Sequence, residues 1–143
     1  MRRLAAAVLV LSFVVAMVGC SLESRDDGPP DIGDVPAAVM SAVPRVTAVE
    51  DPSRWLNGFG HAIGLSLVTA TPDPFTPEEL DAVVKAIWTH LPSKPNTLQI
   101  TAESQAGDVV DLFTAAQHLD ELVVHQAGQA GVSIADMRWR YGQ

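Results

Sequence analysis

The sequence is nearly free of cysteine, since Cys20 is the only one among its 143 residues. A lone thiol has no partner within the chain, so the fold forms without an internal disulfide. Long apolar runs are also scarce: residues 4–18 carry no charge, and Ser12 is their single polar break. About 20 apolar residues are needed to cross the hydrocarbon core of a bilayer, so this run is short for a permanent span.

Basic residues are few, with nine lysines and arginines against 17 aspartates and glutamates, and the formal net charge is −8. A chain this acidic is repelled by nucleic acid and by anionic lipid headgroups. We therefore expect no nucleic-acid partner.

What the N-terminus does contain is ordered like an export signal. Arg2 and Arg3 precede the apolar run, and the small residue Gly19 stands just before Cys20. A positive start, an apolar stretch of 7–15 residues and small residues at a junction are the three parts of such a signal. The alternatives at this point are an ordinary secretory signal with a chance cysteine and an uncleaved anchor.

The four residues Met-Val-Gly-Cys that end at Cys20 resemble the lipobox of bacterial lipoproteins. The resemblance implies that residues 1–19 are a lipoprotein signal peptide and that the Cys20 thiol is joined to diacylglycerol. It also implies a place on the extracytoplasmic face of the cell membrane. Two acyl chains hold a protein firmly, whereas one gives marginal, reversible binding.

The whole chain is similar in organisation to the small alanine- and valine-rich lipoproteins of mycobacteria and related actinobacteria. This resemblance transfers no functional residue beyond Cys20. Removal of residues 1–19 would leave seven basic and 17 acidic residues, a net charge of −10. We therefore expect the lipid to hold the chain while the protein body stands off the surface.

The composition divides the rest of the chain into a tether and one domain. Residues 20–42 are acidic and proline-bearing, which is typical of a flexible linker. Within them, residues 36–43 are compatible either with a helical turn or with a packed arm. Residues 43–143 are predicted to form one small α+β domain, and the sequence shows no internal repeat.

The clearest predicted element is a helix over residues 75–92. Thr76 is placed as N-cap, Pro77 as the first helical residue, and Glu79 completes a capping box. Phe75 and Leu80 are spaced as a hydrophobic staple. Apolar residues recur on one face at helical spacing: Leu80, Val83, Val84, Ile87 and Leu91.

Alternating apolar and polar residues predict strands on both sides of this helix, over residues 61–70 and 96–104. A strand, a helix and a strand with short connections are typical of a parallel pair with a crossover helix. An earlier strand is predicted over residues 45–50, joined to the next by a loop over 51–60.

A second helix is predicted over residues 108–122, capped by Asp108. Two alternatives stay open: it ends near Leu119 and a short extended piece follows, or it continues to Ala127. Residues 136–142 alternate and predict a last strand. The fold expected is an α+β two-layer sandwich. About four strands would form a mixed sheet, in the order strand, strand, helix, strand, helix, strand, with two helices on one face.

Motifs for catalysis are missing, so we predict no catalytic residue and no cofactor. The glycines at 58, 60 and 64 are followed by a strand instead of a helix and lack a P-loop lysine. Residues 64–68 lack the second glycine of a nucleophile elbow. The sequence reasoning therefore favours a binding or structural role over an enzyme.

A metal site is weakly suggested by His118, Glu121 and His125, which would share one stripe if the second helix continues. His118 and His125 would then lie about 10 Å apart, so they cannot easily share one ion. A tetrahedral zinc site would need His61 or His90 as well. A solvated polar face is the favoured interpretation.

Four residues near the C-terminus are the candidate partner contact: Arg138, Trp139, Arg140 and Tyr141. The leading hypothesis is a membrane-anchored envelope lipoprotein with a non-catalytic module that binds another envelope protein or supports an assembly. The alternative is a small-ligand carrier with a pocket between sheet and helices. A metal-dependent enzyme is the third hypothesis.

Overall fold

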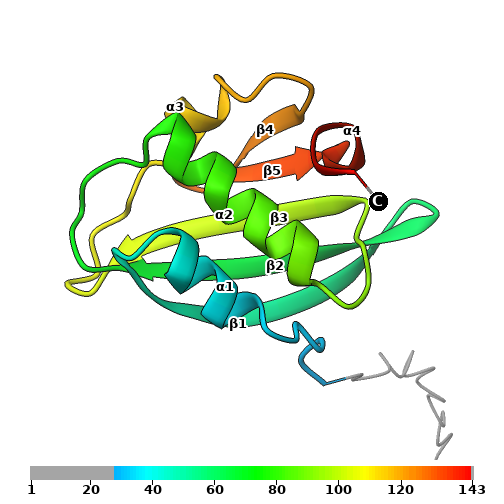
Figure 1. The fold of residues 1–143 in the computed structure, drawn as a ribbon, viewed down its shortest axis with the longest axis horizontal. Helices are drawn as coiled ribbons and strands as arrows, with labels where there is room; N and C mark the ends of the chain where they lie inside the picture. The colour runs from blue at the N-terminus through cyan, green and yellow to red at the C-terminus, as the bar shows by residue number, and fades with distance from the viewer. Residues whose placement is uncertain (1–27, 143) are drawn as a thin grey trace, which may run out of the picture.

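The computed structural model describes residues 28–142, and within this range the chain forms five strands and four helices. The strands make one mixed sheet in the order β1-β2-β3-β5-β4, so β1 and β4 are its edges. Helices α1 and α2 cross the same face of this sheet (Figure 1). In chain order the elements are α1 (Val35–Ala42), β1 (Val46–Asn57), β2 (Gly60–Thr69), α2 (Pro77–His90), β3 (Thr97–Ser104), α3 (Phe113–Ala116), β4 (Val123–Ala127), β5 (Gly131–Ala135) and α4 (Met137–Tyr141).

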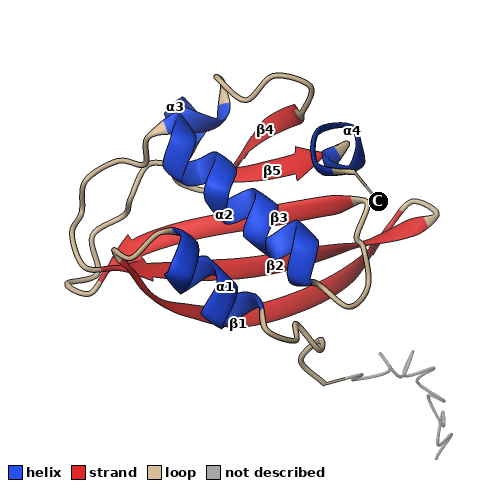
Figure 2. Ribbon diagram, viewed as in Figure 1, coloured by secondary structure: helices blue, strands red, loops and turns tan. Residues whose placement is uncertain are grey.

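The expected α+β class is confirmed, but the number and order of elements differ from the expectation. Four strands and two helices were predicted, whereas residues 28–142 add the helix α1 and contain β4, β5 and the helix α4 in place of one last strand. Figure 2 shows how these additions widen the sheet and extend the helical layer at both ends.

Strand β2, helix α2 and strand β3 confirm the predicted crossover unit. The two strands pair in parallel from Ala62 with Thr97 to Thr69 with Ser104. The β2 side chains that point into the core are the expected ones, Ile63, Leu65 and Leu67. A parallel pair needs a long connection, and α2 supplies it.

Helix α2 starts as its sequence predicts. Thr76 Oγ1 accepts a hydrogen bond from the Glu79 backbone N–H at 3.2 Å, and Glu79 Oε2 accepts one from the Thr76 N–H at 3.0 Å. Arg45 also pairs with Glu79 at 2.9 Å. Burial alone would raise the pKa of Glu79, but the bonds from Arg45 and Thr76 outweigh it and lower the pKa. The carboxylate therefore stays charged at the positive end of the helix.

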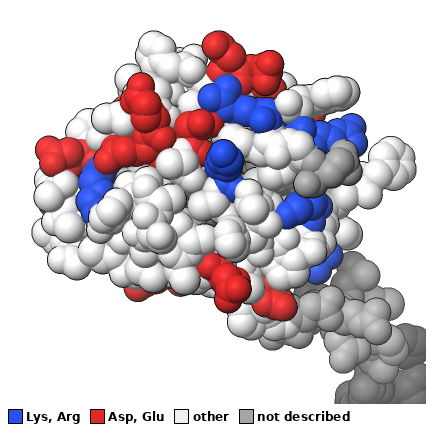
Figure 3. All heavy atoms as spheres, in the orientation of Figure 1, with Lys and Arg blue, Asp and Glu red and all other residues white. Residues whose placement is uncertain are grey.

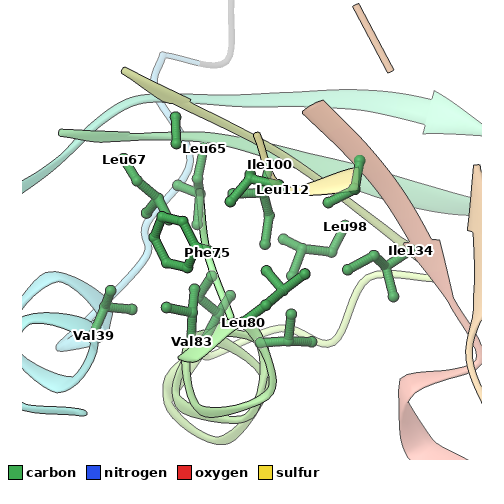
Figure 4. Packing of buried hydrophobic residues seen from close by; sticks show 14 of the residues in the cluster. Val39, Leu65, Leu67, Phe75, Leu80, Val83, Leu98, Ile100, Leu112 and Ile134 are labelled. Atoms are coloured by element: carbon green, nitrogen blue, oxygen red, sulfur yellow. The ribbon is translucent and has the colours of Figure 1, made fainter. Parts of the chain in front are cut away.

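The core lies between α2 and the sheet, where side chains from both layers point toward one another (Figure 4). Burying this apolar surface is the main stabilising contribution to the fold. The largest fully buried side chains come from the sheet, from α2 and from the flanking segments: Leu67, Leu80, Ile87, Leu98, Ile100, Leu112, Ile134 and Met137.

The prediction of a loop over residues 51–60 is wrong, because β1 continues to Asn57. The register of β1 against β2 shifts between Val46 and Ala48 and between Glu50 and Ser53. Asp51 adopts a positive φ of 50° within the second irregularity. Such bulges break the alternation that marks a strand in the sequence.

The tether was predicted to extend through residue 42, but its last eight residues form α1 and belong to the domain. Val35 and Val39 are fully buried, and α1 packs against α2. Pro36 near the start of the helix is compatible with helical geometry. The alternative of a helical turn for this segment is therefore the correct one, and the boundary at residue 43 moves toward the N-terminus. Cys20, the signal segment 1–19 and residues 21–27 lie outside the described residues.

The second helix is much shorter than predicted. Val109 is bridged to Glu103, and α3 begins only at Phe113 and ends at Ala116. The Asp111 carboxylate accepts hydrogen bonds from the backbone N–H groups at this start. If the helix continued past Leu119, its periodicity would place the charged Asp120 on the buried side. The chain turns after α3 instead.

Residues 123–127 form β4, which confirms the short extended piece and contradicts the helix continued to Ala127. Strand β5 was missed altogether. The two strands pair as an antiparallel hairpin, and β5 also pairs with β3. Gly128 takes a φ of 59° in the connecting turn, a conformation that glycine adopts at no steric cost.

Candidate functional site

The C-terminal segment is a helix, so the predicted strand over residues 136–142 is wrong. Asp136 adopts a φ of 63° and turns the chain out of β5 into α4. Met137 is buried, but Trp139, expected on the same strand face, is 70% exposed. Five residues of alternating pattern are too few to distinguish a strand from one helical turn.

The four residues of the candidate partner contact divide into two pairs. Arg140 Nε donates to Asp81 Oδ1 at 2.7 Å, and the Tyr141 hydroxyl donates to the same oxygen at 2.6 Å. Arg138 and Trp139 face outward, with the Arg138 guanidinium 5.5 Å from the centre of the Trp139 ring. Only this outward pair is placed to touch a partner directly.

Charge and burial explain how Asp81 holds α4. Burial alone would raise the pKa of Asp81, but hydrogen bonds from Arg140 and Tyr141 outweigh it and lower the pKa. Burial and then the bond to Asp81 raise the pKa of Tyr141 above its ordinary value. Trp88 Nε1 adds a bond of 2.9 Å to the Gly142 carbonyl oxygen. The helix is therefore fixed to α2 at several points.

A hollow of about 340 Å³ lies beside α4, between it and the end of α2. Lys94 Nζ donates hydrogen bonds to the carbonyl oxygens of Trp88, Thr89 and Leu91. Its positive charge therefore lies at the C-terminal end of α2, where it interacts favourably with the last carbonyl groups of the helix. The Lys94 ammonium also lies 5.3 Å from the centre of the Trp88 ring. The residues around the hollow are Trp88, Lys94, Pro95, Asn96, Asp136, Met137 and Arg138.

The tip of the β1–β2 hairpin is a second exposed feature, and sequence reasoning missed it. Leu56 is 87% exposed and Phe59 is fully exposed. Gly58 takes a φ of 61° at the first central position of the turn, where a type II′ turn takes glycine. Asn-Gly between alternating segments is a hairpin signal, although the two central residues here are Gly58 and Phe59, one position later than the signal places them.

The three tryptophans do not line one groove. Trp88 is in the core, and Trp139 is on α4. Trp55 lies on β1 with its ring against Gly64, so closely that an added Cβ there would meet the ring at 3.1 Å. A shallow hollow of about 290 Å³ lies beside Trp55, and Ser66 and Thr101 in its lining are hydrogen-bonded to each other at 3.0 Å.

The candidate metal ligands are not brought together. His118 and Glu121 lie in the turns after α3, whereas His125 is on β4. Among residues 28–142, no group of three or more histidine, cysteine, aspartate or glutamate side chains is arranged to hold a metal ion. His90 ends α2, and His61 is near Ser93 at 3.5 Å. Burial and then the Arg54 charge lower the pKa of His61.

In the part of the chain that the structure describes, no helix is long and apolar enough to span a membrane. Cys20 lies outside that part, so its lipidation stays a prediction. No protein-family model, no curated protein and no solved structure matches this chain.

Proposed function

We propose that this chain is a lipid-anchored protein of the cell envelope, held on the extracytoplasmic face of the membrane by acylated Cys20. Its domain is a non-catalytic module that binds another envelope protein or supports an assembly. The support for the anchor is the N-terminal sequence. The support for binding is the geometry of α4.

The observation that carries the binding role is the contrast between the two sides of α4. Arg140 and Tyr141 fasten the helix to Asp81, while Trp139 and Arg138 remain exposed. Tryptophan and arginine are the residues most often found as hot spots of protein interfaces. A side chain presented on a fixed helix loses little conformational freedom on binding, which favours affinity.

The test is recovery of a partner from detergent-solubilised membranes by the full chain and by its Trp139→Ala variant. Removal of an interface tryptophan is expected to reduce partner recovery about tenfold or more. The variant should remain folded because Trp139 is mostly exposed. The matched control is Val123→Ala, since Val123 is an exposed apolar residue on β4.

Equal recovery by the native chain and by Trp139→Ala would contradict the proposed contact. An equal loss with Val123→Ala would show that recovery depends on non-specific binding by exposed apolar side chains and not on α4. The small-ligand carrier stays a prediction, and the space it would use between α2 and the sheet is occupied by core side chains (Figure 4).

A further inference from the structure

The hairpin tip combines full exposure with a fixed position. Asn57 Nδ2 donates to Thr97 Oγ1 at 2.7 Å, and Asn96 Nδ2 donates to the Asn57 carbonyl oxygen at 2.8 Å. These bonds tie the base of the turn to β3, whereas Leu56 near the end of β1 and Phe59 in the turn are left in solvent. Large apolar side chains exposed together mark an interaction site more often than a chance arrangement.

The charges near the tip differ from those of the chain as a whole. Arg54 precedes the tip on β1, and two cations, Lys94 and Arg138, line with one carboxylate, Asp136, the hollow that Asn96 joins to the hairpin. Figure 3 shows several basic side chains on the right of this face, while acidic ones gather at the top and left and also along the lower edge. Apolar side chains with arginine and lysine beside them are typical of segments that lie in a membrane interface. The charge is complementary to anionic lipid headgroups.

The position of the chain start limits how far the domain can lie from its anchor. Gly28 is the first described residue and follows Cys20 by eight positions. Eight residues span at most roughly 28 Å when fully extended. The described chain begins toward the same side of the molecule as the hairpin tip (Figure 1). An anchor at Cys20 therefore keeps this end close to the bilayer.

We propose that the hairpin tip, through Leu56 and Phe59, enters the interfacial layer of the anionic bilayer to which Cys20 is anchored. This inference rests on the proposed anchoring. The net negative charge of the chain predicted a domain that stands off the membrane surface. The proposed contact differs from that expectation, because it depends on where the charges lie on the domain and not on their sum. The tip fixes the orientation of the domain and places α4 near the membrane surface.

The test uses the acylated full chain in vesicles of phosphatidylglycerol and phosphatidylcholine. Acylation of Cys20 leaves no free thiol, so Leu56→Cys provides one site for an environment-sensitive fluorophore. The matched control is Ala106→Cys, which is exposed in the turn after β3 at the far end of the sheet. We expect lipid-borne nitroxides to quench the label at 56 about fivefold more than the label at 106.

Two further variants separate the contributions to this contact. Phe59→Ser should reduce the quenching at position 56 in all vesicles, because the apolar part of the contact is lost. Arg54→Glu should reduce it mainly in vesicles that contain phosphatidylglycerol, because charge attraction needs anionic lipid.

Equal quenching at positions 56 and 106 on chains that float with the vesicles would overturn the tip contact while leaving the anchoring intact. A label at 56 that is exposed in vesicles but shielded in native membranes would overturn it in favour of a protein partner. A chain with a bare Cys20 thiol that does not float with vesicles would overturn both the anchoring and this inference.

Discussion

At the scale of single residues, Asp81 is the side chain that decides the conformation of the C-terminus. Its carboxylate accepts hydrogen bonds from Arg140 and Tyr141, which lie about 60 positions later in the sequence. Without this acceptor the hydroxyl of half-buried Tyr141 would lose its partner. A buried polar group left without a partner costs about 1–3 kcal/mol.

We predict that Asp81→Asn lowers the free energy of unfolding at pH 7 by about 1 kcal/mol, a value reduced for the partial exposure of the pair. The folded-state pKa of Asp81 is below the unfolded value of about 3.9. Its contribution is therefore present above that value and is lost as pH falls through the folded pKa. Denaturant unfolding of both chains at pH 7 and at pH 2 measures the difference, which should shrink at pH 2.

The control for this prediction is Glu103→Gln, which removes a charge from an exposed strand position. It should leave the free energy of unfolding nearly unchanged at both pH values. A loss from Asp81→Asn that is equally large at pH 2 would indicate that the charge is not the cause.

At the scale of elements, α2 is the unit with the strongest local signals. Its N-cap, capping box and apolar spacing agree with one another, and the structure confirms all three. Arg45 adds a tertiary ion pair to Glu79 that the sequence did not reveal.

We predict that Thr76→Ala destabilises the fold by about 1 kcal/mol, because the Glu79 N–H loses its acceptor. Thermal unfolding followed by circular dichroism measures the change. The control is Thr89→Ala on the exposed side of the same helix, where alanine favours the helix slightly. If the two variants unfold at the same temperature, the cap contributes nothing measurable.

Elements with weak local signals were predicted poorly, and the reason is physical. Strand β5 is five residues long and begins with glycine, so its pattern resembles a loop. Its place is set by pairing with its hairpin partner β4 and with β3, which is distant in the sequence. Helix α4 alternates like a strand, and it is fixed as a helix by Asp136 and by its bonds to Asp81. Local patterns predicted the crossover unit, and tertiary contacts determined the rest.

The candidate partner contact stays a prediction, and its geometry differs from the expected one. The composition of residues 138–141 indicated a cationic, aromatic segment, but Trp139 was expected on one strand face with Met137 and is exposed on α4 instead. The division between outward Arg138 and inward Arg140 depends on Asp81, which no local pattern identifies. The hairpin tip was not predicted because residues 51–60 were expected to form a loop.

At the scale of the whole molecule, the domain boundary depends on α1. Val35 and Val39 have no exposed surface, so α1 is part of the core. The sequence did not reveal this helix, because the acidic residues before it led to the prediction that residues 20–42 form one flexible linker.

We predict that a chain beginning at Gly28 folds as stably as the longer one, whereas a chain beginning at Val43 loses about 3–6 kcal/mol. The loss follows from removing two fully buried valines, each contributing about 1.5–3 kcal/mol. Chemical denaturation of the purified chains measures both values. Equal stability of the two chains would show that α1 is dispensable and that the tether does extend to residue 42.

Under the proposed anchoring, the irregular edge strand β1 has a consequence for copies of this protein that would share a membrane. Molecules held by lipid in one plane collide sideways far more often than molecules in solution, and open strand edges are sites of aggregation. Pro52 cannot donate a backbone hydrogen bond, and Asp51 beside it departs from extended geometry. A second copy therefore cannot add a continuous strand along the full length of β1, so this edge resists that mode of aggregation.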